Sequence, residues 1–115
     1  MTPVHWPMPL PCGQMSQEYA LTFDRRRAVR LLIVPALFDE ANRMRRLTVE
    51  TMRRLDGAGI DCFLPDLPGT NESLRPLETL TPDDWRDAMA AAAAHFGVTH
   101  MLAIRGGSLL APPRL

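Results

Sequence analysis

The residues of this chain best suited to chemistry stand near its C-terminal end. The short apolar run Met101-Leu102-Ala103-Ile104 leads into Arg105-Gly106-Gly107-Ser108. A strand that ends in small residues and a serine, with a helix after it, is the arrangement that exposes a serine hydroxyl for attack on a carbonyl carbon. Ser108 is therefore a candidate nucleophile.

The turn around Ser108 can be placed in two registers. Its pattern is small-x-nucleophile-x-small, because small side chains let the strand turn sharply while the nucleophile is held in a strained conformation. Over residues 106–110 the nucleophile is Ser108, but Leu110 then occupies a position that needs a small residue.

The second register covers residues 103–107. Ala103 and Gly107 then fill both small positions, and Arg105 stands at the nucleophile position. A guanidinium stays protonated near neutral pH and cannot attack a carbonyl. The small residues at positions 103 and 107 favour this register over the first one. With this register the protein would lack a nucleophile and would not hydrolyse a ligand.

Composition indicates a small globular domain that binds neither nucleic acid nor a membrane. The chain has 115 residues, 46% of them hydrophobic, and a formal net charge of zero, so we expect one domain at most and neither a nucleic-acid nor a membrane partner. Cys12 and Cys62 show no CxxC spacing, so we expect free thiols, no metal and no cofactor. No signal-peptide pattern opens the chain, and the apolar run over residues 31–38 is too short to span a bilayer. Cytoplasmic localisation is the expectation.

The N-terminal residues predict extended structure. Four prolines within residues 1–17 exclude helix and disfavour a central strand. We expect an extended lead-in there that contacts the domain through Trp6 and Met8. An edge strand is predicted over residues 18–23, and residues 24–27 predict a solvated charged turn.

Strands and helices alternate over the rest of the chain. Residues 28–35 are almost continuously apolar, which is typical of a parallel strand covered on both faces. Asp39 and Thr81 are suited to cap helices. The expected elements are a strand over 28–35, a helix over 40–56, a strand over 60–64, a helix over 82–96 and a strand over 98–104. The buried face of the first helix is predicted from spacing as Met44, Leu47, Thr51, Met52 and Leu55.

The loop after the strand over 60–64 carries a motif. Asp66, Gly69 and Ser73 match Asp-x-x-Gly-x-x-x-Ser, in which a glycine permits a tight turn and polar side chains hold the loop. This segment resembles the one after the fourth strand of the α/β-hydrolase superfamily, and the resemblance covers residues 19–111. Residues 35–46, a proline followed by an acidic stretch with Asn and Arg, are most similar to the hydrolases associated with exosortase systems.

The resemblance implies an α/β fold. It would be a partial parallel sheet with flanking helices in the order β-α-β-α-β, truncated after the strand that leads to the nucleophile. The implied organisation is a lead-in over 1–17, the N-terminal part of an α/β-hydrolase domain over 18–111 and a tail over 112–115. The oxyanion hole would use backbone N–H groups of Ala36 and Leu37 together with that of the residue after the nucleophile.

In this superfamily an acid and then a histidine follow the nucleophile along the chain. No Asp, Glu or His follows Ser108, and His5, His95 and His100 are expected to be surface or capping residues. The resemblance therefore implies a truncated member of an ester or thioester hydrolase family that is inactive as this isolated chain.

Two alternatives remain open. One is a serine hydrolase that acts on a small-molecule acyl or ester substrate through Ser108. The other is a non-hydrolytic binding or scaffolding module in which Arg105 meets an anionic group at the carboxyl edge of the sheet. In either case an open sheet edge would invite a partner or self-association.

Overall fold

The chain forms one mixed sheet whose strand order differs from the order along the sequence. The computed structural model describes residues 1–9, 14–36, 39–66, 81–104 and 107. The elements within these residues are β1 (Thr2–Pro9), β2 (Met15–Phe23), β3 (Arg30–Val34), α1 (Asp39–Gly57), β4 (Asp61–Pro65), α2 (Pro82–Phe96) and β5 (His100–Ala103). The sheet runs β1-β2-β4-β3-β5, with β4, β3 and β5 parallel and the pairings β1–β2 and β2–β4 antiparallel. The predicted β-α-β-α-β order is confirmed as β3-α1-β4-α2-β5.

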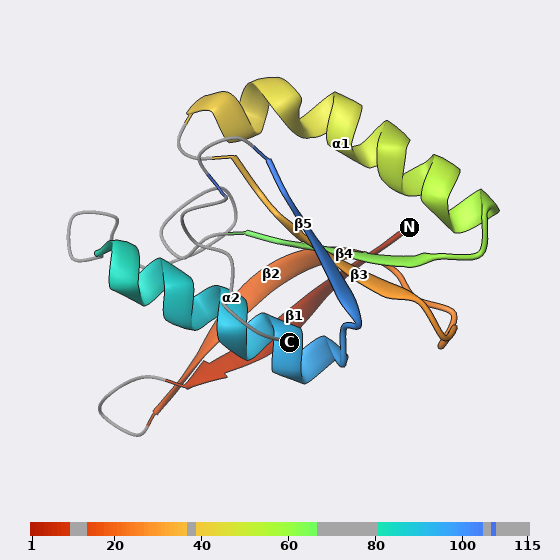
Figure 1. Cartoon of the computed structure of the whole chain (residues 1–115). Helices are drawn as coiled ribbons and strands as arrows, with labels where there is room; N and C mark the ends of the chain where they lie inside the picture. The colour runs from red at the N-terminus through yellow and green to blue at the C-terminus, as the bar shows by residue number, and fades with distance from the viewer. Residues whose placement is uncertain (10–13, 37–38, 67–80, 105–106, 108–115) are drawn as a thin grey trace.

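The helices α1 and α2 cover opposite faces of the sheet (Figure 1). The chain passes from β3 to β4 through α1, and then from β4 through α2 to β5, on the other side of β3. Because such crossovers are right-handed, a reversal of direction along the sheet moves the connecting helix to the other face. The result is a three-layer arrangement with a core on each side of the sheet.

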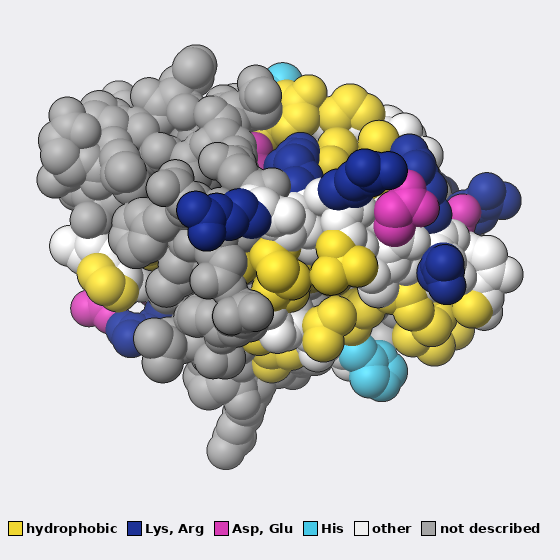
Figure 2. Space-filling view, turned by 90° about the horizontal axis from the view of Figure 1, so that it is seen from above, with side chains coloured by type: hydrophobic (Ala, Val, Ile, Leu, Met, Phe, Trp, Pro, Cys, Tyr) yellow, Lys and Arg dark blue, Asp and Glu magenta, His cyan; other side chains and the backbone are white. Residues whose placement is uncertain are grey.

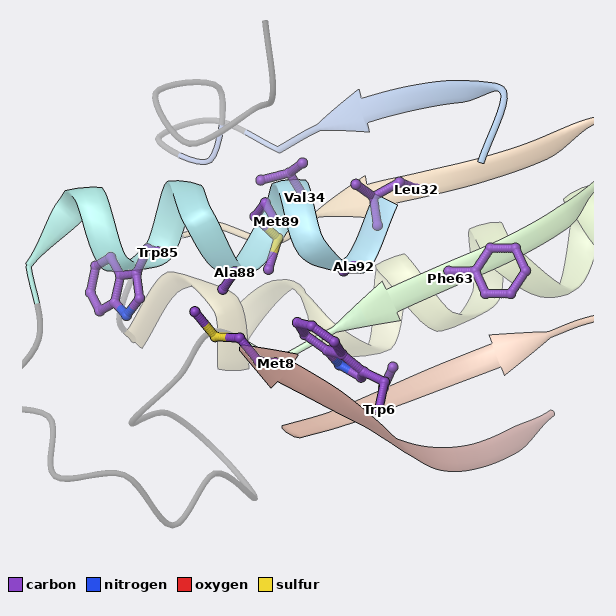
Figure 3. Close-up of a cluster of buried hydrophobic side chains, with 10 residues drawn as sticks. Trp6, Met8, Leu32, Val34, Phe63, Trp85, Ala88, Met89 and Ala92 are labelled. Atoms are coloured by element: carbon purple, nitrogen blue, oxygen red, sulfur yellow. The ribbon is translucent and has the colours of Figure 1, made fainter. Parts of the chain in front are cut away.

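The core beneath α2 includes the N-terminal strand. Figure 3 shows Trp6 and Met8 of β1 directed toward α2, where Trp85 and Met89 lie. All four side chains are buried in one cluster with Phe63 of β4. The expected contact of the N-terminal residues through Trp6 and Met8 is confirmed. The core beneath α1 is smaller and consists of Leu21, Phe23, Ile33, Met52, Cys62 and Leu64.

The strand predicted over residues 18–23 is confirmed as part of β2, but its predicted position at the edge of the sheet is wrong. These residues belong to β2, which lies between β1 and β4, and the sheet ends at β1 instead. Pro3, Pro7 and Pro9 all occupy odd positions of β1, opposite in phase to the buried Trp6 and Met8. A proline has no N–H to donate to β2, so these positions must be those whose backbone faces away from the sheet. The prolines thereby protect the outer edge of β1 against further pairing.

The predicted face of α1 is wrong in one position. Met52 is fully buried and Thr48 is buried with it, but Leu47 is 60% exposed. Thr48 and Met52 face the sheet, whereas Leu47 lies on the side of the helix toward β5, where no other described element covers it. The strand predicted over residues 28–35 also begins later than expected. Val29 is exposed and lies before β3, which starts at Arg30.

The start of α2 agrees with the sequence. Thr81 accepts a hydrogen bond from the backbone N–H of Asp84, and the Asp84 side chain accepts one from the N–H of Thr81. Pro82 occupies the first turn, where its missing N–H costs nothing. Gly97 ends the helix in the left-handed conformation.

The predicted solvated turn over residues 24–27 is wrong for Arg27. The side chain of Asp61, the first residue of β4, is fully buried and accepts hydrogen bonds from Arg27 Nε at 2.6 Å and Arg30 Nη1 at 2.9 Å. Arg27 also pairs with Asp56, and Arg30 with Asp24. This network joins the amino ends of β3 and β4, at the sheet edge opposite to the candidate site.

Candidate functional site

The carboxyl ends of β3 and β5 form the topological switch point of the sheet. From β3 the chain turns toward β4 on the α1 face, whereas β5 lies on the other side of β3 and is reached over the α2 face. In open α/β sheets, ligands bind in the crevice outside the carboxyl ends of the strands at such a point. Pro35 and Ala36 follow β3 here, and Ile104 and Gly107 follow β5.

A hydrogen bond of the turn type follows β5 directly. Ile104 still donates its N–H to the carbonyl oxygen of Val34, at 3.0 Å, which extends the β3–β5 pairing by one residue. Gly107 then donates its N–H to the carbonyl oxygen of Ile104, at 2.9 Å. A bond from residue i+3 to residue i is typical of a turn, so the extended pairing of β5 with β3 ends at Ile104.

Gly107 is buried against the end of β3. A β-carbon added to it would lie 2.9 Å from the carbonyl oxygen of Val34 and closer still to that of Pro35. Real β-carbons are essentially never this close to a backbone oxygen, so the position requires glycine. The turn after β5 is thus packed directly onto the backbone of the neighbouring strand.

Ala36 lies at the same place, immediately after β3. It is buried, and none of the described residues accepts a hydrogen bond from its N–H. The role of this N–H in an oxyanion hole stays a prediction. The other expected donor, Leu37, lies outside the described residues.

A small cavity opens between this edge and α1. Its volume is about 20 Å³, which is room for one water-sized molecule. Ala36, Arg45, Asp66 and Ile104 are among its lining residues. Arg45 Nη1 lies 3.6 Å from Oδ1 of Asp66, whose side chain is almost fully buried, and the N–H of Asp66 donates to the carbonyl oxygen of Tyr19. Asp66 therefore joins the end of β4 to β2 and to α1. Its expected role in the loop that follows stays a prediction, because that loop lies outside the described residues.

A second buried acid at this edge was not predicted. Glu18 of β2 is one residue from Tyr19, and its side chain is buried. Ser16 Oγ donates to its Oε1 at 2.8 Å, but its Oε2 has no hydrogen-bond partner among the described residues. The residue types around Glu18 in the sequence carry no motif, and its place in the fold comes from the pairing of β2 with β1, where Glu18 lies opposite Trp6.

The histidines lie away from the turn after β5, since His5 is on β1, at the opposite side of the sheet from β5. His5, His95 and His100 are exposed, as expected for surface residues. His100 opens β5 at the amino end, where its Nδ1 lies 2.8 Å from Thr99 Oγ1. None of the three can reach the turn after β5 as a catalytic base.

Several predicted site residues lie outside the described residues. These are Arg105 and Ser108 at the turn after β5, and Gly69 and Ser73 of the loop motif. Within the described residues, no group of three or more His, Cys, Asp or Glu side chains could hold a metal ion. No helix of the described chain is long and apolar enough to cross a membrane.

Comparison with known proteins places this geometry in a known fold. No protein-family model and no curated protein sequence matches the chain. A solved structure of a protein from Agrobacterium vitis S4 that is assigned as a hydrolase has a TM-score of 0.67 at 12% identity, over 89% of this chain and 39% of its own. The haloalkane dehalogenase DpaA from Paraglaciecola agarilytica NO2 has a TM-score of 0.65 at 16% identity, over 94% of this chain and 36% of its own.

A third similar structure is Est1E from Butyrivibrio proteoclasticus, solved with ferulic acid bound. Its TM-score is 0.58 at 17% identity, over 76% of this chain and 38% of its own. These identities show the fold alone, which is the partial α/β-hydrolase-type fold expected from the sequence. The chain spans less than two-fifths of the length of each of these three proteins.

Proposed function

We propose that this chain is the N-terminal structural part of an α/β-hydrolase-type domain and that the 115 residues by themselves hydrolyse no ester. The strand order β1-β2-β4-β3-β5 supports the first half of the proposal, since the similar structures share the fold over 76–94% of this chain. The second half is supported by the turn after β5. Gly107 packs against Pro35 as the last small residue of small-x-nucleophile-x-small would, and this register has Arg105 at the nucleophile position.

Catalytic residues beyond the turn are also lacking in these 115 residues. No Asp, Glu or His follows Ala103 in the sequence, and the histidines before it are remote from the turn after β5. A hydroxyl at Ser108 would therefore have no base to take its proton. The backbone N–H of Ala36 alone would polarise an acyl carbonyl without a nucleophile to attack it.

The test is a search for an acyl-enzyme. The purified chain is mixed with p-nitrophenyl acetate and, separately, with a fluorophosphonate probe, and Ser108→Ala serves as the matched control. We expect no burst of nitrophenolate and no labelling in either protein. A stoichiometric burst that Ser108→Ala abolishes would overturn the proposal and establish the serine register.

A second function is favoured by the same glycine. With Arg105 at the turn after β5, its guanidinium would lie at the switch point, where a carboxylate or phosphate group can accept paired hydrogen bonds from it. We therefore propose an anion-binding role for this edge. Titration calorimetry with inorganic phosphate should show binding that Arg105→Ala removes. The matched control Arg46→Ala removes an exposed arginine of α1 and should leave binding unchanged. An equal loss of phosphate binding in both variants would contradict a site at Arg105, because it would show that only the net charge of the chain matters.

Two narrower proposals, on subfamily and on location, are each supported by one observation. Assignment to the exosortase-associated hydrolases is supported by the sequence of residues 35–46 alone. A reducing, cytoplasmic location is supported by the free, buried thiol of Cys62. Cell fractionation of the tagged chain tests the second proposal, and recovery in an extracellular fraction would contradict it.

A further inference from the structure

The turn between β2 and β3 encloses the carboxylate of Asp61. The backbone N–H of Arg25 donates to Oδ1 of Asp61 at 3.1 Å, and the backbone N–H of Arg27 donates to its Oδ2 at 2.8 Å. Arg26, between the two donors, has a positive φ of 56°, which residues other than glycine seldom adopt. A left-handed residue in a turn can direct neighbouring N–H groups into one concavity, and such concavities bind anions. The turn therefore has the form of an anion site, and Asp61 occupies it.

Two guanidinium groups complete this site. Arg27 Nε donates to Oδ1 of Asp61 at 2.6 Å, and Arg30 Nη1 donates to Oδ2 at 2.9 Å. Each carboxylate oxygen thus accepts one hydrogen bond from the backbone and one from a guanidinium group. The two oxygens of a carboxylate offer about four acceptor positions, and hydrogen bonds to an ionised acceptor are the strong ones. The donor set therefore matches a carboxylate in both number and charge.

The bound carboxylate is hidden from solvent, but the arginines around it are not. Arginine and acidic side chains lie next to one another on the face seen over α1 (Figure 2). Surface pairs of this kind, such as Arg53 with Glu50, stay in contact with water. The side chain of Asp61 is fully buried instead, whereas those of Arg27 and Arg30 are 22% and 18% exposed. A small anion can therefore approach the site from solvent beside these two arginines once residue 61 has no carboxylate.

The same two arginines bind the carboxyl ends of both helices. Arg27 Nη1 donates to the carbonyl oxygen of Asp56, in the last turn of α1, at 2.7 Å. Arg30 donates from Nε and Nη2 to the carbonyl oxygen of Phe96, the last residue of α2, at 3.0 and 2.8 Å. Positive charge at the C-terminus of a helix is stabilising. One carboxylate thus orients two guanidinium groups, and each of these binds a helix on a different face of the sheet.

We propose that the turn between β2 and β3, together with the side chains of Arg27 and Arg30, is a receptor for a carboxylate and that Asp61 is its internal ligand. The receptor then binds a small free carboxylate when residue 61 has no acidic side chain. This proposal does not depend on the chemistry at Arg105 or on other parts of a larger domain, because every donor belongs to the described residues. It makes the start of β4 a bound ligand that holds α1 and α2 to the sheet.

The test supplies the missing carboxylate from solution. Asp61→Ala replaces the carboxylate group by a hydrogen atom, so formate has the size of the space that opens. Thermal unfolding of this variant is measured at pH 7 in rising sodium formate, with sodium chloride added to constant ionic strength. The unfolding midpoint should rise with formate, and at ten times the dissociation constant the ratio of folded to unfolded chain should be about 10-fold higher. If Asp61→Ala is unfolded without formate, formate should restore its circular dichroism spectrum.

Two variants serve as matched controls. Asp61→Asn keeps a side chain of the same size in the site, so formate has no space and the midpoint should not change. Glu50→Ala removes the partner of Arg53 at the surface of α1 and should also show no response. The proposal is overturned if formate neither stabilises nor refolds Asp61→Ala, or if either control responds equally. Equal stabilisation of Asp61→Ala by chloride alone would also overturn it, because the site would then not recognise a carboxylate.

Discussion

Gly107 packs with its α-carbon against the backbone carbonyl of Pro35, so closely that no side chain fits between them. The contact joins the turn after β5 to the end of β3, the two strands that form the switch point of the sheet. It also explains why the chain has a glycine two residues after Arg105. The site that we propose for anions is thus shaped by a backbone contact that leaves no room for a side chain at residue 107.

Substitution of Gly107 should disturb this edge. Gly107→Ala places a methyl group against carbonyl oxygens of the backbone, and we expect the free energy of unfolding to fall by about 1–3 kcal/mol. Gly57→Ala is the matched control. Gly57 lies in α1 with nothing within 4 Å of an added β-carbon, so the same change should raise stability by about 0.5–1 kcal/mol. Urea unfolding followed by circular dichroism measures the free energy of unfolding of both variants. An equal change in the two variants would contradict the close contact between Gly107 and Pro35.

Removal of the charge of Asp61 should be costly. Asp61→Asn leaves Arg27 and Arg30 without their buried partner, so we expect a loss of about 2–4 kcal/mol, less than for a fully enclosed pair because both arginines reach solvent. Glu50→Gln breaks an exposed pair with Arg53 on the surface of α1 and should cost less than about 0.5 kcal/mol. The comparison of the two variants by chemical unfolding separates a buried network from a surface ion pair. Similar losses would contradict the structural role of Asp61.

The same network makes stability depend on pH. Burial raises the pKa of Asp61, but hydrogen bonds from the Arg27 side chain and from the backbone N–H groups of Arg27 and Arg25 outweigh it, so the pKa lies below its ordinary value. The hydrogen bond from Arg30 likewise lowers the pKa of Asp24. An acid with a lowered pKa in the folded state stabilises that state above its unfolded pKa, about 4, and the stabilisation is lost as pH falls through the folded value.

Unfolding measured from pH 6 to pH 2 should therefore show a loss of stability below about pH 4. In Asp61→Asn this loss should be smaller, since one of the responsible carboxylates is gone. An unchanged pH profile in the variant would assign the acid sensitivity to other groups.

The thiol of Cys62 should be inert in the folded chain. Burial raises its pKa to about 11, so the reactive thiolate is scarce at neutral pH, and the sulfur is enclosed by the core beneath α1. In a Cys12→Ser background, a disulfide reagent such as DTNB should react with Cys62 only as fast as the chain unfolds. Rapid reaction under native conditions would mean that α1 detaches from the sheet.

The alternation of strands and helices in this chain was predictable because its signals are local. The capping box of Thr81 and Asp84 involves residues three positions apart, so the local sequence already contains both partners of each hydrogen bond. The apolar run that became β3 is similar, since a strand covered on both faces needs hydrophobic residues at every position.

The position of each element in the sheet was decided by contacts between residues far apart in the sequence. The N-terminal prolines became the protected edge because β1 pairs with β2, and β2 became an inner strand because it also pairs with β4. Arg27 is partly buried and paired because Asp61, 34 residues away, is the first residue of β4. Leu47 has the helical spacing of a core residue, yet it lies beside β5, where no described element covers it. Periodicity shows which residues can share a face, but only tertiary structure determines what lies opposite that face, because strand order depends on pairings that a local pattern does not contain.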